Sequence, residues 1–216
     1  MLLYIQPYRS IPIINDNRGL YAWGYNFTGQ IGDGTRTTRS SPTQVGVLLT
    51  WANVAGGEHS LAVKQDGTLW AWGDNSNGEL GDGTRTHRSS PTQVGSLTTW
   101  ADVSSKLHHS VARRTDGTLW GWGFNTNGQL GDGTITHRSS PVQIGSLTNW
   151  SAVTCGHDHS LALKTNGAVW AWGIGTSGEL GDGSLVSKSS PVQVGTLTNW
   201  TKVAGGWRHS LGLKIM

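Results

Sequence analysis

The chain has 216 residues, with 32 glycines, 12 tryptophans and only 13% charged side chains. So much glycine excludes a mainly helical fold, because glycine is unfavourable inside helices. The formal net charge of +3 does not by itself predict a nucleic-acid partner, which calls for clustered basic residues. Cys155 is the single cysteine, so no disulfide can form within the chain.

The N-terminal segment, residues 1–19, precedes the regular part of the sequence. Its first ten residues lack the basic start and long apolar stretch of a signal peptide, and no apolar run in the chain approaches the ~20 residues of a membrane span. We therefore expect a cytoplasmic or virion-associated chain. Residues 11–14 align with the later strand segment 60–63, and Pro12 favours an edge position because it has no N–H. The segment is thus predicted to carry a degenerate edge strand.

Residues 20–216 repeat a set of short markers four times, 50 residues apart, with one step of 49. Each unit carries Trp-x-Trp-Gly (Tyr-x-Trp-Gly in the first), then Gly-Asp-Gly, Ser-Ser-Pro, a lone tryptophan and His-Ser. The residue missing from the short step lies between Val54 and His59, and we place it in a loop, because a deletion inside a strand would flip every later side chain. The predicted units are about 20–68, 69–118, 119–168 and 169–216.

Each unit contains a strong hairpin signal. Residues 159–164 alternate apolar and polar side chains, as a half-buried strand does. Asn166-Gly167 then separates them from a second strand at 168–172, and such pairs favour tight turns in which both residues take positive φ. Shorter strands are expected near 178–180 and 191–194. About four short strands per ~50 residues is typical of a propeller blade.

The motifs Leu-Trp-Ala-Trp-Gly (69–73), Gly-Glu-Leu-Gly-Asp-Gly (78–83) and Val-x-x-Gly-x-x-His-Ser-Leu-x-Leu (153–163 and 203–213) resemble the RCC1-like (regulator of chromosome condensation) repeats. The resemblance covers about residues 20–215, although Lys106 replaces the glycine of the last motif. It implies an all-β fold of propeller blades, usually seven. Four such blades cannot close a ring, so we expect an open or partial propeller, or one completed by another chain. Self-closure by four blades is the alternative.

Three recurring motifs are interpreted as structural. A Ser–His nucleophile needs a base in reach and a group to orient it, whereas His-Ser recurs here in every unit, as a structural hydrogen bond would. Each Gly-Asp-Gly loop offers one carboxylate, too few for calcium, so an Asx-type turn is expected. The regularly placed tryptophans are interpreted as core between blades rather than a stacking platform.

Two sets of residues are candidates for partner binding. One repeat position is basic in every unit and predicts a curved stripe for an acidic protein surface or phosphates, or else local pairing with the Gly-Asp-Gly aspartates: Arg39, Arg88, Arg138 and Lys188. The second set differs between units, as binding loops on one face of a repeat protein do: Lys106, Leu107, His108, His157, Asp158, Trp207, Arg208, Tyr25, Phe27 and Phe124. Trp207 stands out, since its counterparts in the other units are not tryptophan.

No nucleotide-binding loop, zinc cluster or dinucleotide fingerprint is present. We therefore expect no enzyme activity, cofactor, metal or small-molecule substrate. The first hypothesis is a structural or protein-binding module that binds protein partners or copies of itself, such as a virion component of the phage tail or capsid-associated kind. The alternative is regulation of a partner through the propeller face, by guanine-nucleotide exchange on a small GTPase, as the resemblance allows, or by enzyme inhibition.

Overall fold

The computed structural model describes residues 18–47 and 50–216, and every regular element within these ranges is a β-strand. Three antiparallel four-stranded sheets follow one another along the chain. Blade 1 contains β3 (Trp51–Gly56), β4 (His59–Lys64), β5 (Leu69–Gly73) and β6 (Arg88–Gln93). Blade 2 contains β7 (Trp100–Ser105), β8 (His109–Arg114), β9 (Leu119–Gly123) and β10 (Arg138–Gln143). Blade 3 contains β11 (Trp150–Cys155), β12 (His159–Lys164), β13 (Val169–Gly173) and β14 (Lys188–Gln193).

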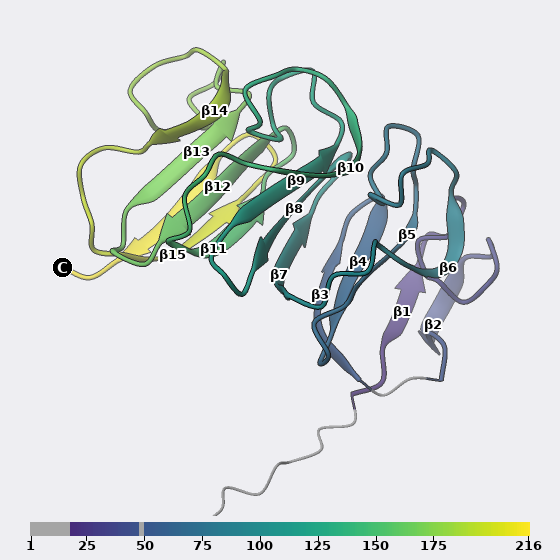
Figure 1. Cartoon of the computed structure of the whole chain (residues 1–216). Coiled ribbons are helices and arrows are strands. Elements are labelled where there is room, and N and C mark those ends of the chain that lie inside the picture. Colours follow the sequence, from purple (N-terminus) through teal and green to yellow (C-terminus); the bar gives the residue numbers. More distant parts are fainter. Residues whose placement is uncertain (1–17, 48–49) are drawn as a thin grey trace, which may run out of the picture.

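Two half-blades flank these sheets. β1 (Tyr21–Gly24) pairs with β2 (Arg39–Gln44), and β15 (Trp200–Gly205) pairs with β16 (Ser210–Lys214). The five sheets lie side by side in an arc, with β1 and β2 at one end and β15 near the C-terminus at the other (Figure 1). No ladder joins β1 to β16 in the described part of the chain, which confirms the expected open or partial propeller.

The first strand of each complete blade and of the half-blade β15–β16 is the inner one. β3 contacts β7, β7 contacts β11, and β11 contacts β15, so these four strands line the concave side of the arc. The one-residue deletion falls in the turn between β3 and β4, where two residues replace the three found between β7 and β8. Its predicted position in a loop is confirmed. Within the described residues, no helix long and apolar enough to cross a bilayer is found.

The predicted hairpins are present between β4 and β5, β8 and β9, and β12 and β13. Their turn geometry differs from the prediction. Gly67 has φ of +78°, but no residue other than glycine has positive φ in the described ranges. Asp66 instead accepts the Thr68 N–H through Oδ1 at 2.9 Å, so the aspartate acts by an Asx-type hydrogen bond while glycine alone supplies the left-handed residue.

One predicted strand is wrong. Residues 178–180 form a turn rather than a strand, bracketed by Gly178 and Gly181 at φ of +83° and +65°. The strand that the prediction omitted is the inner one, which starts at the lone tryptophan, as in β3 and β15. The strand expected at 191–194 is found as part of β14. The predicted edge strand at 11–14 lies outside the described residues.

The sheets are out of phase with the sequence repeats. The predicted unit 69–118 contains the outer strands β5 and β6 of blade 1 and the inner strands β7 and β8 of blade 2. One unit therefore crosses a junction between two blades. As a result, the recurring motifs of one unit lie on both sides of a junction between two blades.

These junctions hold the apolar core. Between blades 1 and 2 the cluster comprises Leu61, Val63, Leu69, Ala71, Leu80, Val94, Trp100, Val103, Ala112 and Trp122. A second cluster fills the junction of blades 2 and 3, with Val111, Leu119, Ile144, Trp150, Val153, Cys155, Ala162 and Trp172. The expectation that tryptophans form the core between blades is confirmed at these positions. Trp23 and Trp207 are exposed instead.

Candidate protein-binding face

A set of four polar groups, which we call the interblade clasp, crosses each junction between complete blades. At blades 1 and 2, His59 Nε2 lies 2.6 Å from Ser110 Oγ, which donates to the Glu79 carbonyl at 2.8 Å. Trp122 Nε1 donates to the same carbonyl at 2.7 Å. The clasp between blades 2 and 3 consists of His109, Ser160, the Gln129 carbonyl and Trp172.

The direction of these hydrogen bonds defines their chemistry. A serine hydroxyl has one proton, and in Ser110 it is donated to the carbonyl, so His59 Nε2 must carry a proton and donate it to Oγ. Nδ1 of His59 then holds the lone pair and has no hydrogen-bond partner. A catalytic Ser–His pair requires the opposite direction, with the histidine accepting the serine proton. The predicted structural role of His-Ser is confirmed by this arrangement.

Burial keeps the clasp histidines neutral. Desolvation lowers the pKa of His59 to about 4 and that of His109 to about 3. His159, which reaches Ser210 at 3.0 Å, has its pKa lowered to about 4, also mainly by burial. These side chains therefore stay uncharged near pH 7 and act as hydrogen-bond donors within the core.

The Gly-Asp-Gly aspartates organise the outer loops. Asp82 Oδ1 accepts the Thr84 N–H at 2.9 Å, and its Oδ2 lies 2.8 Å from Arg88 Nη2. Burial alone would raise the pKa of Asp33, but hydrogen bonds from Thr35 and Arg39 lower it to about 2. The predicted Asx-type turns are confirmed.

The basic stripe takes part in the same loops. Its members face the aspartates at 2.6, 2.8, 2.8 and 3.7 Å in the order Arg39, Arg88, Arg138 and Lys188. These ion pairs are the local pairing with the Gly-Asp-Gly aspartates that the sequence indicated as the alternative to a partner-binding stripe. Their side chains remain 32–37% exposed, so a role in binding stays a prediction.

Sequence reasoning missed the buried asparagines that hold these loops. Asn75 Nδ2 donates to the carbonyls of Thr84 and Thr86 at 3.2 and 3.1 Å, and Asn75 Oδ1 accepts the Leu80 N–H. Asn26 and Asn125 make the same contacts. The signal was a recurring asparagine two residues after Trp-x-Trp-Gly, which becomes Gly175 in the last unit.

The variable loops gather on one face, because the turn between β7 and β8 meets the loop after β9. The Phe124 N–H donates to the His108 carbonyl at 2.8 Å, and the two rings lie 6.0 Å apart. Phe124 also stacks on His137 at 4.7 Å. His108 Nδ1 lies 3.7 Å from Glu79 Oε1. His108 and Phe124 therefore form one aromatic and acidic group over blades 1 and 2.

A second group lies over blade 3 and the β15–β16 half-blade. Trp207 stacks on His157 with ring centroids 4.5 Å apart, and His157 Nδ1 lies 2.6 Å from Asp158 Oδ2. Lys106 Nζ reaches across the concave side to the Gly205 carbonyl at 3.2 Å. Leu107 is half-buried, whereas Arg208 is exposed beside Trp207. Tyr25 and Phe27 stack at 6.4 Å, and they lie on the other half-blade.

Some variable positions change together across a junction. Gln129 Nε2 donates to Asp158 Oδ1 at 3.2 Å, and at the preceding junction the equivalent pair is Glu79 with His108. Part of the difference between units therefore reflects complementary pairs between blades. The sequence signal was the matched change at two positions 29 residues apart.

Asp74, Glu79 and His108 bring metal-ligating atoms within 4.8 Å of one another. Three side chains are fewer than the four ligands of a structural zinc site. Glu79 also accepts hydrogen bonds from Asn77 through both carboxylate oxygens. This group is accordingly described as a polar cluster, and no metal is assigned to it.

These blades, clasps and loops define a protein of the β-propeller class. The model of the regulator of chromosome condensation (RCC1) repeat matches residues 19–63, 66–113, 116–163 and 166–213. A second model with the same description matches 100–129 and 150–179. The chain belongs to the RCC1 repeat family.

Solved structures agree with this assignment. Human WBSCR16 is similar with a TM-score of 0.83 and 27% identity, over 93% of this chain and 54% of that one. Prp20p from Saccharomyces cerevisiae has a TM-score of 0.78 and 23% identity, over 91% of this chain and 52% of that one. The chain thus spans about half the length of the structures it matches. A search of curated protein sequences found no match.

Proposed function

We propose that this chain is a non-catalytic protein-binding module that holds partner proteins on its loop face, within an assembly. The observation that carries the proposal is Trp207. Its side chain is 64% exposed, yet its ring is held against His157 at 4.5 Å. Tryptophan and arginine are enriched at the energetic centres of protein interfaces, and Arg208 lies next to it in the same turn.

The surroundings of Trp207 support binding by pre-organisation. A side chain that is already fixed loses little conformational entropy when a partner covers it. Asp158 and Lys106 place opposite charges near the aromatic pair, which favours an orientated protein partner over a purely apolar one. Phe124 and His108 extend the same face over blades 1 and 2, and Tyr25 and Phe27 extend it over the first half-blade.

The clasps support the non-catalytic part of the proposal. Each clasp serine donates its proton to a carbonyl and each clasp histidine is neutral and buried. The recurring residues that resemble catalytic groups are thus occupied in holding blades together.

The relatives support a binding role in general terms. A study of Prp20p describes its binding to Gsp1p and histones, and another describes yeast RCC1 bound to Kap60. At 23% and 22% identity these structures are evidence of fold alone, and neither points to a virion. Regulation of a partner through the propeller face, by guanine-nucleotide exchange on a small GTPase or by enzyme inhibition, remains the alternative. A nucleotide-release assay on a small GTPase would test the exchange activity.

The proposal is tested by affinity enrichment from lysate of the source cells, comparing the wild-type chain with Trp207→Ala and Arg208→Ala. Ile135→Ala, at an exposed apolar residue of an outer loop, is the matched control. We expect the variants at 207 and 208 to lose a specific partner about tenfold or more, while the control keeps it. Equal recovery by all chains would contradict the proposal. Each variant is first checked for the wild-type mass in solution, so that a change in self-association is recognised separately.

A further inference from the structure

The two half-blades of this chain are complementary parts of one blade. In blade 1 the inner pair β3–β4 is joined to the outer pair β5–β6 through the β4–β5 ladder. Among the described residues, the half-blade β15–β16 has the inner pair alone, and β1–β2 has the outer pair alone. Unpaired strand edges are templates for another strand. We propose that a second copy of this chain completes both, with β16 of one copy pairing with β1 of the other.

The apolar cluster beside β15–β16 lacks one side chain that β1 carries. The complete cluster between blades 1 and 2 includes Trp122, from the third strand of the following blade. The corresponding cluster at blade 3 retains counterparts of most other members, from Leu161 to Val203, but has no tryptophan from a following blade. In its place is a groove of about 300 Å³, lined by Leu161, Val169, Leu180, Gly181, Val194 and Trp200.

The missing tryptophan is available on β1. Trp23 holds the repeat position of Trp72, Trp122 and Trp172. Those three side chains are at most 2% exposed, whereas Trp23 is 61% exposed. At the equivalent place, Gly131 lies so close to Trp172 that an added Cβ would come within 2.7 Å of its indole nitrogen. Gly181 leaves the same space, with only Val194 nearby.

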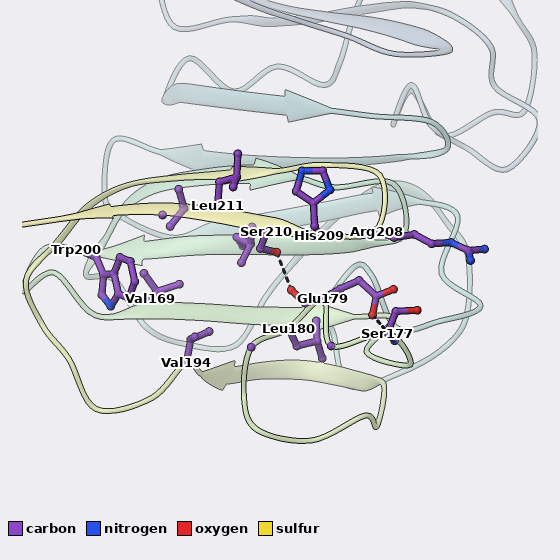
Figure 2. A pocket seen from close by; sticks show the side chains of 15 residues that line it. Val169, Ser177, Glu179, Leu180, Val194, Trp200, Arg208, His209, Ser210 and Leu211 are labelled. Carbon is purple, nitrogen blue, oxygen red and sulfur yellow. Dashed lines mark hydrogen bonds between the residues drawn. The ribbon is translucent and has the colours of Figure 1, made fainter.

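The opposite end of the chain lacks two side chains that β16 carries. Trp51, Ala62, Trp72 and Val45 cluster between β1–β2 and blade 1, and no described residue of this cluster is a counterpart of Leu61 or Val63. Leu211 and Leu213 hold those positions on β16 and are 63% and 64% exposed. Leu211 and His209 point away from the groove that faces blade 3, whereas Ser210 points into it (Figure 2). The two leucines therefore face the side on which a following blade would lie.

The interblade clasp is divided between the same two ends. Ser210 donates to the Glu179 carbonyl at 2.7 Å, but among the described residues that carbonyl receives no tryptophan N–H, and His209 has no serine partner. Ser60 donates to the Gln30 carbonyl at 2.8 Å, and no histidine in the described ranges reaches its hydroxyl. Pairing in the register of β4 and β5 would bring Trp23 to Glu179 and His209 to Ser60 of the other copy.

The number of blades also favours two copies. The described residues of each copy supply three whole blades and two halves, so those of two copies closed head to tail make eight blades, within the ~4–8 of known propellers. The chain covers 54%, 52% and 50% of the three RCC1-type structures it matches. Head-to-tail contacts form a ring when the rotation between copies closes.

Light scattering and native mass spectrometry of the 216-residue chain test the proposal directly. We expect twice the 23.1 kDa of one chain. Leu211→Asp and Trp23→Ala should shift this toward one chain and weaken association at least tenfold. Ile135→Asp, on an equally exposed side chain outside both half-blades, should keep the double mass. A variant starting at Arg18 should also keep it. A wild-type chain that stays single at all concentrations would overturn the proposal, as would a variant starting at Arg18 that stays single.

The direction of pairing is tested with cysteines at positions that the β4–β5 register places opposite each other. Leu61 pairs with Ala71 in blade 1, so Ala22→Cys and Leu211→Cys are introduced into separate chains. Cys155 is buried, and burial raises the pKa of its thiol to about 12, so it should not compete. We expect a disulfide-linked pair only when the two variants are mixed. In the double variant, a bond within one chain would indicate self-closure by a single copy and would overturn the proposal, as would the absence of any bond between the mixed variants.

Discussion

Trp122 and Trp23 occupy the same repeat position, yet Trp122 is fully buried and Trp23 is 61% exposed. The same contrast separates Leu61 from Leu211, which are 0% and 63% exposed. At the junction of blades 1 and 2 every member of the motif has a neighbour from the next blade. At the two half-blades the same side chains lack that neighbour. The comparison teaches that a repeat motif encodes half of an interface, which the following blade must complete.

The largest expected difference between the two regions concerns tryptophan. In a Leu211→Asp background, which should keep the molecule a single copy, Trp122→Ala should lower the free energy of unfolding by about 3–5 kcal/mol, because it opens a cavity in a buried cluster. Trp23→Ala in the same background should change it by less than about 0.5 kcal/mol, since the side chain is exposed. Denaturant titration measures both. Equal losses would show that Trp23 is already buried within its own chain.

The clasp serines should differ in the same direction. Ser110→Ala removes both the acceptor for His59 and a donor to the Glu79 carbonyl, so a buried imidazole N–H is left unpaired. This should cost about 1–3 kcal/mol of unfolding free energy. Ser60→Ala in a single copy removes one hydrogen bond to Gln30 and should cost about 1 kcal/mol. Urea titration measures the unfolding midpoint of each variant. A lower midpoint for Ser110→Ala than for Ser60→Ala is the result expected if His59 donates its proton to Ser110.

The pH dependence tests whether the clasp histidines are neutral. Their pKa is lowered to about 3–4 in the folded chain, from about 6.5 when unfolded. Between these values the unfolded chain binds more protons, so stability should fall as the pH drops from about 6.5 to about 4, by up to about 1.4 kcal/mol per pH unit for each histidine. His109→Gln should flatten this slope. An unchanged slope would mean that His109 is not the buried neutral group described here.

The smallest effects are expected in the outer loops, which depend less on a neighbouring blade than the apolar core and the clasps do. Arg88→Ala breaks an ion pair of a side chain that is 36% exposed, so its cost should stay below about 1 kcal/mol. Asp82→Ala should cost more, about 1–3 kcal/mol, because it also leaves the Thr84 N–H and hydroxyl without their shared acceptor. Thermal unfolding of the two variants ranks them. The reverse order would contradict the description of the aspartate as the organiser of the loop.

Much of the fold could be predicted from the sequence because it is periodic. The His59–Gly73 hairpin follows from alternation and an Asp-Gly turn, and the open arc follows from the number of repeats. The strand beginning at Trp51 could not be recognised, because its signal is one tryptophan followed by small residues. The turn at 178–180 was mistaken for a strand because Glu-Leu between glycines resembles a short extended segment.

The candidate site was less predictable, since it depends on contacts between units. Variation at His108 and Asp158 indicated a surface, whereas these residues face Glu79 and Gln129 of the preceding blade. Trp207 was identified correctly as a side chain that the core does not require, and its exposure agrees with this. Its stack on His157 could not be read from the sequence, because the two residues lie on different sheets.

The central claim is that the half-blades complete one another between copies, and amide hydrogen exchange tests it most directly. The N–H groups of β1 and β16 that face away from β2 and β15 should become protected as protein concentration rises, whereas those of β4 and β5 should be protected equally at all concentrations. Leu211→Asp should abolish the concentration dependence. Rapid exchange of β1 and β16 at every concentration would contradict the account, as would protection of both strands that is already complete in a single copy.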